Sequence, residues 1–302
     1  MVRAEAAQGL RLLSTARPLT WLDVFTSTPL AGNGLAVIHD ADGLDDATMV
    51  AVARETAQSE TTFVQRPTAD GADYRNRIYT QVEEIRFAGH PSLGTAVAVA
   101  HARGEREARY LQQTIAGIQP VEVEFASDSV ARASMLQEPS EFGAPVDPLP
   151  VLGALGLGPA DAHPDLPVQP VSTGIFHLMV PLRDHVALQR IRPNLQRVES
   201  LEDRTSTMVL YAFVCEGDEG GDGLVHARGF FAERSYVLED PATGSAAGPL
   251  CAYLHHHAGR PAATIAQGVD MGRPSRLETA VAGDRVQVAG DCVVLMDGAI
   301  RL

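Results

Sequence analysis

The feature that most constrains the fold of this chain is a short pattern that occurs twice. Residues 90–96, His-Pro-Ser-Leu-Gly-Thr-Ala, read position for position like residues 240–246, Asp-Pro-Ala-Thr-Gly-Ser-Ala, with Pro, Gly and Ala identical in the two copies. Each copy follows a strand-like stretch, residues 85–88 and 236–238, and opens an apolar segment of helical length. Because the seven-residue pattern and the segments on either side of it repeat together, we infer an internal duplication and two similar halves.

The segments that begin at the two copies, residues 91–103 and 244–258, are almost uniformly apolar and small. A helix that is apolar all round is a buried helix, so we expect each one to run through the middle of a curled sheet. A third helix is predicted at residues 45–57, where apolar residues recur at helical spacing behind two aspartates. A short helix is predicted near residues 149–157.

Strand-like runs dominate the remaining chain. They alternate or cluster β-branched and aromatic residues between Gly, Pro and Asp, and examples are residues 20–25, 35–39, 61–65, 77–80, 121–125 and 208–215. The expected fold class is therefore α/β (α+β), with two pseudo-symmetric half-domains that each wrap a curled sheet around a central helix.

A length of 302 residues favours two domains of ordinary size. We place the boundary near residues 117–120, ahead of a segment rich in Pro, Gly and Ala at residues 139–170. The predicted N-terminal half-domain covers residues 18–118, and the last ten or so residues of the chain are candidates to join it. The C-terminal half-domain covers residues 119–302. Residues 1–17 lack a turn or cap signal and are interpreted as an extension.

The basic residues exclude several classes of enzyme. All 24 are Arg, and no Lys occurs in the chain. Schiff-base enzymes, pyridoxal-phosphate enzymes and Walker-type nucleotide binders all require a Lys side chain, so these three classes are excluded. The net charge of -14 and the lack of an Arg cluster argue against nucleic acid or anionic lipid as a partner. No apolar run approaches a membrane span and no secretory signal is present, so a soluble, cytoplasmic protein is expected.

No metal site is predicted. Cys215, Cys251 and Cys292 are odd in number and far apart, which suggests neither a disulfide framework nor a zinc site. The three consecutive histidines at 255–257 point in different directions on a helix and cannot converge on one ion. They precede Gly259 and are interpreted as residues at the negative end of a helix dipole. Residues 217–223, acidic and rich in Gly, are interpreted as a solvated hairpin loop.

The duplicated element can bind an anion. A strand that turns into a helix exposes unpaired backbone N–H groups at the positive end of the helix dipole, and two such starts that face each other would trap a negative group. Pro at 91 and 241 suits the first helical position, which makes His90 and Asp240 cap-position residues beside the ligand. An alternative stays open, in which Asp240 only caps its helix and His90 is a satisfied buried histidine.

A series of segments runs in order along most of the chain and resembles the PhzF (phenazine biosynthesis) family. These are Asp-Val-Phe at 23–25, Gly-Asn at 32–33, Ala-Val at 36–37, Ser-Glu-Thr at 59–61, Phe-Ala-Gly-His-Pro at 87–91, Glu-Asp-Pro-Ala-Thr-Gly-Ser-Ala-Ala-Gly at 239–248 and Met-Gly-Arg-Pro-Ser at 271–275. The resemblance implies a diaminopimelate-epimerase-like fold with the site in the cleft between the halves. It also implies a homodimer and no cofactor.

The resemblance also implies roles for individual residues. The acid/base carboxylate of the family corresponds to Glu60, which on its own would be read as an ordinary surface glutamate. His90 and Asp240 stand where the related two-cysteine epimerases have their thiols, and they are expected to hold an amino or hydroxyl group of the substrate. The expected anchors of the substrate carboxylate lie at the two helix starts and are Gly89, Ser92, Gly244 and Ser245.

The predicted function is that of an isomerase that shifts a double bond by proton transfer on a small unsaturated cyclic carboxylate or amino acid, as the dihydro-hydroxyanthranilate isomerases of phenazine biosynthesis do in secondary metabolism. An epimerase or lyase on the same scaffold and a catalytically silent binding relative remain alternatives. A serine hydrolase is set aside, because residues 244–248 do not form the G-x-S-x-G elbow. Gly34 and residues 230–234 lack prolines that are usual in the family, which leaves the substrate open.

Overall fold

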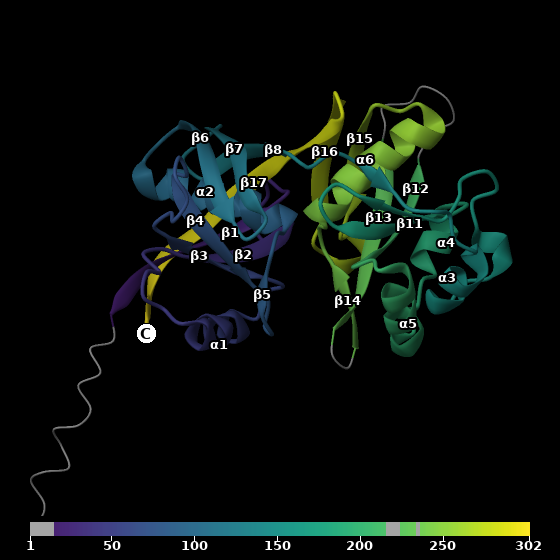
Figure 1. Cartoon of the computed structure of the whole chain (residues 1–302), viewed down its shortest axis with the longest axis horizontal. Helices are drawn as coiled ribbons and strands as arrows, with labels where there is room; N and C mark the ends of the chain where they lie inside the picture. Colours follow the sequence, from purple (N-terminus) through teal and green to yellow (C-terminus); the bar gives the residue numbers. More distant parts are fainter. Residues whose placement is uncertain (1–14, 216–223, 234–235) are drawn as a thin grey trace, which may run out of the picture.

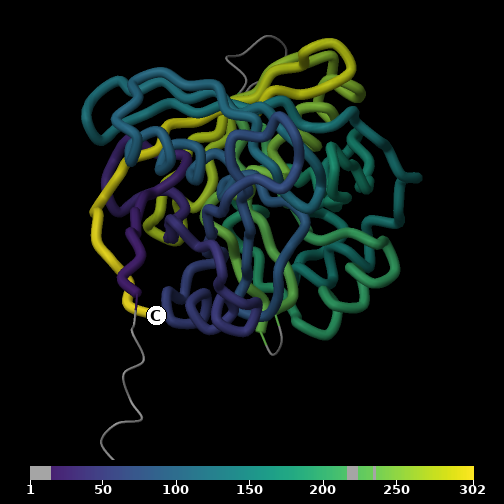
Figure 2. Tube along the Cα trace, turned by 60° about the vertical axis from the view of Figure 1, so that its left-hand side comes forward, coloured from purple at the N-terminus to yellow at the C-terminus, as the bar shows by residue number. Residues whose placement is uncertain are grey.

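The computed structural model describes residues 15–215, 224–233 and 236–302. Most of the predicted extension and the acidic segment 217–223 lie outside these ranges. Residues 16 and 17 are not part of an extension, because β1 begins at Ala16 and pairs with the C-terminal strand. The described start and the end of the chain lie side by side (Figure 2), joined by the bond from Thr15 N to Leu302 O.

Eight strands of the N-terminal half close into a barrel around helix α2 (Gly89–Arg103). In order around the barrel they are β1 (Ala16–Val24), β2 (Asn33–Ile38), β3 (Thr61–Gln65), β4 (Tyr74–Tyr79), β6 (Glu107–Thr114), β7 (Gly117–Phe125), β8 (Val130–Leu136) and β17 (Arg285–Arg301), which returns to β1. Every residue of α2 from Gly89 to Ala100 is buried. The buried helix inside a curled sheet is thus confirmed.

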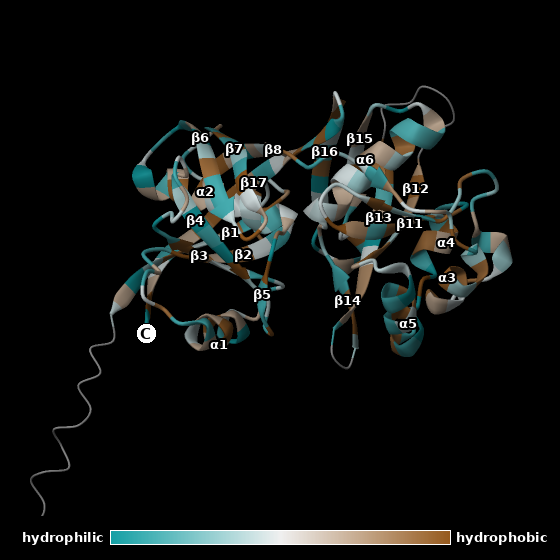
Figure 3. Cartoon of the chain, viewed as in Figure 1, coloured by the Kyte–Doolittle hydropathy of each residue, from teal (hydrophilic) through white to brown (hydrophobic). Residues whose placement is uncertain are grey.

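The strands of the C-terminal half wrap around helix α6 (Gly244–Ala258) and continue the same sheet through β17. They are β9 (Glu141–Phe142), β10 (Gln169–Ser172), β11 (Phe176–Pro181), β12 (Leu210–Cys215), β13 (Leu224–Glu233), β15 (Ala262–Gln267) and β16 (Ser275–Ala282). Figure 3 shows α6 apolar over most of its length and hydrophilic at its C-terminal end, where the three histidines precede the left-handed Gly259. The interpretation of these histidines as helix-end residues is confirmed.

A short hairpin leads into each buried helix. In the first half β4 pairs with β5 (Glu84–Ile85) just before α2, and in the second half β13 pairs with β14 (Tyr236–Asp240) just before α6. Figure 1 shows both hairpins beside the gap that separates the halves. The duplication seen in the sequence therefore extends to the elements around the repeated pattern.

Strand β17 connects the two halves. Residues 285–289 pair with β16 in the C-terminal half, residues 287–293 pair with β8, and residues 292–301 pair with β1. Figure 1 shows this strand running from β16 across to the N-terminal barrel. The last residues of the chain therefore pair with β1 in the N-terminal half.

The boundary predicted near residues 117–120 falls inside β7, which pairs with β6 along its whole length and then with β8. Gly117 has a φ of 132° and forms the turn of the β6–β7 hairpin, so the glycine marks a hairpin rather than the end of a domain. We propose instead that the N-terminal half extends to Leu136 and that the Pro-rich segment at residues 139–170 begins the second half.

Helices on the outside cover the sheet in both halves. Met49, Val52 and Ala53 of α1 (Asp46–Thr56) pack on the outer face of β2, β3 and β4, and Asp45 caps this helix by accepting from Thr48 N. Three helices cover the strands of the C-terminal half and form its outer core: α3 (Pro148–Ala154), α4 (His185–Gln189) and α5 (Leu195–Thr205). The helices α1 and α3 are confirmed, whereas α4 and α5 were not predicted. No helix among the residues placed by the structure is long and apolar enough to cross a membrane.

Candidate active site

The structure brings Glu60, His90 and Asp240 together from both halves. Glu60 lies between α1 and β3, His90 is the second residue of α2, and Asp240 ends β14. The Nε2 atom of His90 lies 3.5 Å from Oε2 of Glu60, and their side chains are 5% and 14% exposed. These two atoms have no hydrogen-bond partner within the described ranges, so they face each other as a buried pair of polar groups.

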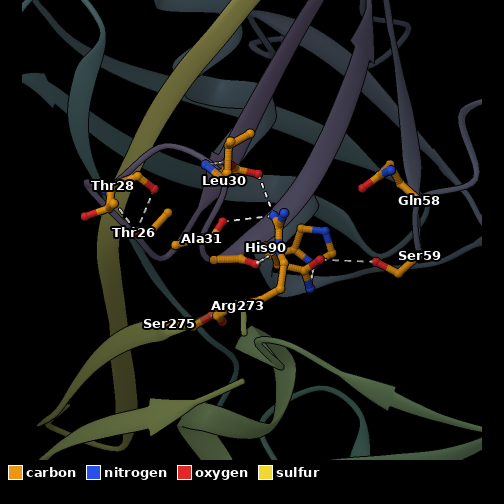
Figure 4. Close-up of polar contacts among 12 residues, drawn as sticks. Thr26, Thr28, Leu30, Ala31, Gln58, Ser59, His90, Arg273 and Ser275 are labelled. Carbon is orange, nitrogen blue, oxygen red and sulfur yellow. Dashed lines mark hydrogen bonds and ion pairs between the residues drawn. The ribbon is translucent and has the colours of Figure 1, made fainter. Parts of the chain in front are cut away.

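Asn33 joins the members of this group. Its Nδ2 donates to Oδ1 of Asp240 over 2.8 Å and to the carbonyl of Ala242 over 3.0 Å, and lies 3.3 Å from Nδ1 of His90. Its Oδ1 accepts from the hydroxyl of Ser59 over 3.4 Å. Figure 4 shows Ser59 and His90 in this region. The two hydrogens of this amide are directed at Asp240 and Ala242, and a neutral His90 ring carries one N–H and one acceptor nitrogen.

Burial determines the charge states of the three groups. Burial and the charge of Asp240 raise the pKa of Glu60 to about 8, against a hydrogen bond from Ser59 that lowers it. Burial lowers the pKa of His90 to about 3 and raises that of Asp240 to about 6. At neutral pH the site therefore contains a largely protonated Glu60, a neutral His90 and a largely ionised Asp240.

Asp240 is ionised despite its burial because several donors surround it. The hydroxyl of Thr243 donates to Oδ2 over 2.8 Å, and hydrogen bonds from Thr243, Ala242 and Asn33 oppose the rise of its pKa. Gln267 fixes the turn behind it, since its Nε2 donates to the Asp240 carbonyl over 2.7 Å and its Oε1 accepts from Thr243 N. The carboxylate is thus held in one orientation at the start of α6.

The two helix starts face each other at Gly89. A Cβ atom on Gly89 would lie 2.5 Å from the carbonyl carbon of Gly244 and 2.6 Å from the nitrogen of Ser245. Only a glycine permits this approach. The expected juxtaposition of the helix starts is therefore present, with Gly89 and Gly244 at the point of contact.

The predicted cap positions of His90 and Asp240 are wrong. The N-caps are Ala88 and Thr243, so His90 lies inside the first turn of α2 while Asp240 precedes the cap of α6. The helices begin at Gly89 and Gly244, where the extended Ala88 and Thr243 precede the first turn. Residues at equivalent positions of the two sequence copies therefore occupy different positions relative to the starts of their helices.

The hydroxyl groups of the other predicted anchors differ in whether they are free to contact a ligand. The hydroxyl of Ser92 is fully buried and donates to the carbonyl of Ala88 over 2.8 Å, so it supports the helix start. The hydroxyl of Thr95, one turn further along α2, is also engaged, since it donates to the hydroxyl of Thr62 in β3 over 2.8 Å. Ser245 is partly exposed, and no hydrogen bond of its hydroxyl occurs within the described part of the chain. Ser245 is thus the hydroxyl that is free to reach a ligand.

Arg273 ties the halves together beside the site. Its guanidinium donates to Oδ1 of Asp23 over 2.6 Å and to the carbonyls of Ala31 and Gly32 over 2.9 and 2.8 Å. Figure 4 shows Arg273 reaching from the second half to the loop that carries Ala31. Asp23 is 1% exposed and also accepts from Leu30 N, so this loop, which leads directly to Asn33, is fixed from two sides.

The β13–β14 hairpin forms a further wall. Glu233 pairs with Tyr236 and Phe231 with Leu238, in register with the pair of Gly229 and Asp240. Since side chains two residues apart in a strand share a face, these pairs lie on the same face of the hairpin as Asp240. The charge of Glu233 contributes to the raised pKa of Glu60. From Asp240 toward the tip of the hairpin, this face thus carries first the apolar pair of Phe231 and Leu238 and then the acidic Glu233.

Sequence reasoning missed the roles of Asn33, Gln267 and Arg273. Asn33 and Arg273 stand inside segments that carry the family resemblance, and that was the only available signal for them. Their partners lie more than two hundred residues away along the chain. Within the placed residues, no three His, Cys, Asp or Glu side chains gather in a way that could hold a metal ion.

The comparison with known proteins agrees with this geometry. The model of the family described as "Phenazine biosynthesis-like protein" matches residues 22–298. This chain belongs to the phenazine biosynthesis-like family. The family and the fold expected from the sequence are confirmed.

Named relatives in the phenazine biosynthesis-like family include isomerases. The trans-2,3-dihydro-3-hydroxyanthranilate isomerase of Pseudomonas fluorescens is 37% identical over 93% of this chain and 98% of its own length. An uncharacterized isomerase of Mesorhizobium japonicum is 34% identical over 92% of this chain and 96% of its own length. The expectation of an isomerase agrees with both.

Solved structures place the fold in the same family. A PhzF-family phenazine biosynthesis protein of Bacillus anthracis superposes with a TM-score of 0.83, at 25% identity over 95% of this chain and 100% of its own. A predicted epimerase of Pseudomonas aeruginosa gives a TM-score of 0.81 at 35% identity, over 94% and 99% of the two chains. A hydroxyproline epimerase of Agrobacterium vitis, at 15% identity over 95% of this chain and 93% of its own and a TM-score of 0.60, shares the fold.

Proposed function

We propose that this protein is an isomerase that moves a proton on a small unsaturated cyclic carboxylate or amino acid, with Glu60 as the acid/base group. The observation that carries the proposal is the pairing of a buried carboxyl of pKa about 8 with a neutral imidazole 3.5 Å away. A proton shuttle works best when its pKa lies near the operating pH, because the group must both accept and return the proton.

The reaction needs no external reagent. The ionised Glu60 takes a proton from an allylic C–H bond of the substrate, and the electron pair of that bond shifts along the conjugated system. The carboxylic acid so formed returns the proton to another carbon of the same system. One C–H bond is broken and one is formed, so the product is an isomer and Glu60 is regenerated.

His90 and Asp240 position the substrate in this proposal. The neutral His90 and the ionised Asp240 would bind its amino or hydroxyl group, since one offers an N–H and the other accepts. The substrate carboxylate would bind at the facing helix starts, through backbone N–H groups near Gly89 and Gly244 and through the free hydroxyl of Ser245. Ser92 would contribute by fixing the first of these starts.

An assay with trans-2,3-dihydro-3-hydroxyanthranilate, the substrate named for the Pseudomonas fluorescens relative, tests the proposal. A change in ultraviolet absorbance shows that the conjugation has moved, and solvent deuterium on a product carbon shows that the returned hydrogen came from a group that exchanges with solvent. An epimerase would instead invert a stereocentre without changing absorbance. Binding without either change would identify a silent relative and contradict the proposal.

The homodimer, the cytoplasmic location and the independence from cofactors remain predictions. Light scattering on the purified protein gives the oligomeric state. Activity that survives chelation and dialysis supports cofactor independence, and activity that is lost and returns with one added ion contradicts it.

A further inference from the structure

The second buried helix contains a proline, and this proline removes a backbone hydrogen bond next to the candidate site. Pro249 lies inside α6, in its second turn. In an α-helix the N–H of each residue donates to the carbonyl four positions earlier, so Pro249, which has no N–H, leaves the carbonyl of Ser245 without its helical donor. The first copy of the repeat has Val99 at the equivalent position, and Val99 keeps its N–H. The start of α6 therefore needs a donor that the start of α2 does not need.

The side chain of His177 lies on the face of β11 that packs against α6. Side chains alternate along a strand, and Met179, two residues further on, packs in the inner core together with Leu250 of α6. Leu178, which lies between the two, packs in the outer core instead. Val171, the cross-strand neighbour of His177, also belongs to the inner core. His177 is 0% exposed, so its ring is enclosed between the sheet and the helix.

The backbone of Ser245 is the polar group that acts on this ring. Burial lowers the pKa of His177 to about 3, and a polar contact with the Ser245 backbone opposes the fall. A carbonyl opposes such a fall because it accepts from the ring, whereas a backbone N–H would add to it. The contact is longer or more bent than an ideal hydrogen bond, and no other described residue partners either ring nitrogen. At neutral pH the uncharged ring has one N–H to offer to this carbonyl.

We propose that His177 is a positioning residue of the proposed isomerase, whose ring N–H donates to the Ser245 carbonyl in place of the N–H that Pro249 lacks. Ser245 is the second residue of α6, and its hydroxyl and N–H belong to the helix start where the substrate carboxylate would bind. The carbonyl of Gly244, one residue earlier, is held by Gln137, whose Nε2 donates to it over 2.9 Å. Two side chains from outside the helix thus fix the turn that presents Ser245. The role of His177 rests on the proposed function only for the identity of the ligand.

A double-mutant cycle of His177 and Pro249 tests the proposal, because alanine has the N–H that proline lacks and is better accommodated inside a helix. The proteins compared are the full-length wild type, His177→Leu, Pro249→Ala and the double variant. Met179→Leu is the matched control, since it changes a buried residue on the same face of β11 at similar volume. Calorimetry gives the binding of 2-aminobenzoate, a flat ring that carries a carboxylate and an amino group. Turnover of trans-2,3-dihydro-3-hydroxyanthranilate gives kcat and KM.

His177→Leu should weaken the binding of 2-aminobenzoate about 3–10-fold, the effect of one lost hydrogen bond. It should raise KM by a similar factor and leave kcat nearly unchanged, because it alters how the substrate is held and leaves the proton-transfer group in place. Adding Pro249→Ala should restore binding, since the new backbone N–H can donate to the Ser245 carbonyl. The double variant should therefore bind like Pro249→Ala alone, and Met179→Leu should bind like the wild type.

The proposal is overturned if His177→Leu binds 2-aminobenzoate like the wild type, if the double variant binds as weakly as His177→Leu, or if the wild type does not bind it at all. If His177→Leu does not fold, the double variant decides: a folded protein that binds like Pro249→Ala supports the proposal, and an unfolded one overturns it. A wild type that binds 2-aminobenzoate without isomerising the substrate contradicts the proposed function alone. Turnover with an unchanged KM in His177→Leu contradicts the role of His177 alone.

Discussion

Asn33 Nδ2 donates to Oδ1 of Asp240 over 2.8 Å, although the two residues belong to opposite halves of the molecule. The same nitrogen lies 3.3 Å from Nδ1 of His90. His90 and Asp240 are the equivalent residues of the two copies, so a single amide from the first half links the duplicated positions. Its contacts fix the orientation of Asp240 and hold His90 beside it.

Replacing Asn33 by Ala should lower kcat/KM about 10–100-fold, because the free energy of a hydrogen bond to a charged group is added to the activation barrier when that bond is lost. The pH dependence should change as well, because the pKa of Asp240 rises when this donor is lost. Asn194→Ala is a matched control, since Asn194 only caps α5 and its loss should affect stability alone. Unchanged kcat/KM and pH dependence in Asn33→Ala would show that Asn33 has no positioning role.

Glu60→Gln should abolish turnover and leave ligand binding largely intact. Gln keeps the size and much of the hydrogen bonding of Glu, but it cannot accept and return a proton. General acid/base groups contribute about a hundredfold to ten-thousandfold, and a sole shuttle should lie near the upper end of that range. The exposed Glu55 of α1 supplies the control Glu55→Gln. More than about a tenth of wild-type activity in Glu60→Gln would exclude it as the shuttle.

The fold could be predicted where apolar pattern and repetition agree. The helix at 244–258 has the predicted limits, because a mostly apolar segment bounded by a glycine at each end allows few alternatives. The strand at 61–65 also has its predicted limits. Gly117, interpreted as a boundary signal, lies in a hairpin turn, because glycine occurs equally in turns and at domain boundaries and only the pairing of β7 with its neighbours distinguishes the two.

The candidate site could be predicted only through its motifs. His90 and Asp240 stand out because they head the two copies, and Glu60 follows from the family resemblance. The contacts of Asn33 with Asp240 and of Arg273 with Asp23 depend on how two distant segments pack, which no spacing along the chain reveals. The cap of α2 was misplaced because Pro91 is accommodated within the first turn, where its missing N–H costs nothing, whereas Pro241 lies ahead of the cap of α6.

The raised pKa of Glu60 predicts the pH dependence of activity. If the ionised carboxylate takes the first proton, kcat/KM should rise about tenfold per pH unit below about 8 and level off above it. The nearby Asp240 and Glu233 couple to this titration, so the measured value belongs to the group rather than to Glu60 alone. A kcat/KM that does not change between about pH 6 and 8 would contradict the assignment.

The same pKa predicts how stability depends on pH. The folded pKa of about 8 lies above the ordinary value of 4.5, so the folded state favours the protonated form. The resulting contribution to stability is complete below about pH 4.5 and is lost as pH rises through about 8. Gln carries no charge at any pH. The Tm of Glu60→Gln should therefore rise relative to the Tm of the wild type as the pH is raised between these limits. An equal difference in Tm at both ends would refute a buried, titrating Glu60.

Gly89→Ala should separate the helix starts. The added Cβ would meet the backbone of Gly244 and Ser245 at 2.5 and 2.6 Å, and backbone atoms cannot rotate away as a side chain can. We expect the free energy of unfolding to fall by about 1–3 kcal/mol and the free energy of binding of the substrate carboxylate to weaken by more than that. Gly298→Ala in β17 is the control, because nothing lies within 4 Å of the atom it adds. Wild-type stability and binding in Gly89→Ala would show that the contact is not required.

The pair of Arg273 and Asp23 should contribute to the stability of the whole fold, because it joins the halves at a buried carboxylate. Arg273→Met leaves Asp23, which is 1% exposed, with Leu30 N as its remaining partner, and an unpaired buried charge costs about 3–5 kcal/mol. Arg273 itself is 32% exposed, which places the expected loss at the lower end of that range. Arg276→Met, from a pair with Glu278 in which the arginine is 66% exposed, should cost less than about 1 kcal/mol.

A double-mutant cycle separates the pair from its surroundings. Asp23→Asn removes the charge that Arg273→Met leaves unpaired, so the double variant should be more stable than the sum of the two single effects predicts. Chemical denaturation of the four proteins gives the coupling energy, which we expect to be about 1–3 kcal/mol. The loop before Asn33 depends on the same contacts, so kcat/KM should fall together with stability in Arg273→Met. Additive losses would mean that the two side chains do not act as a pair, and unchanged activity would separate the loop from the site.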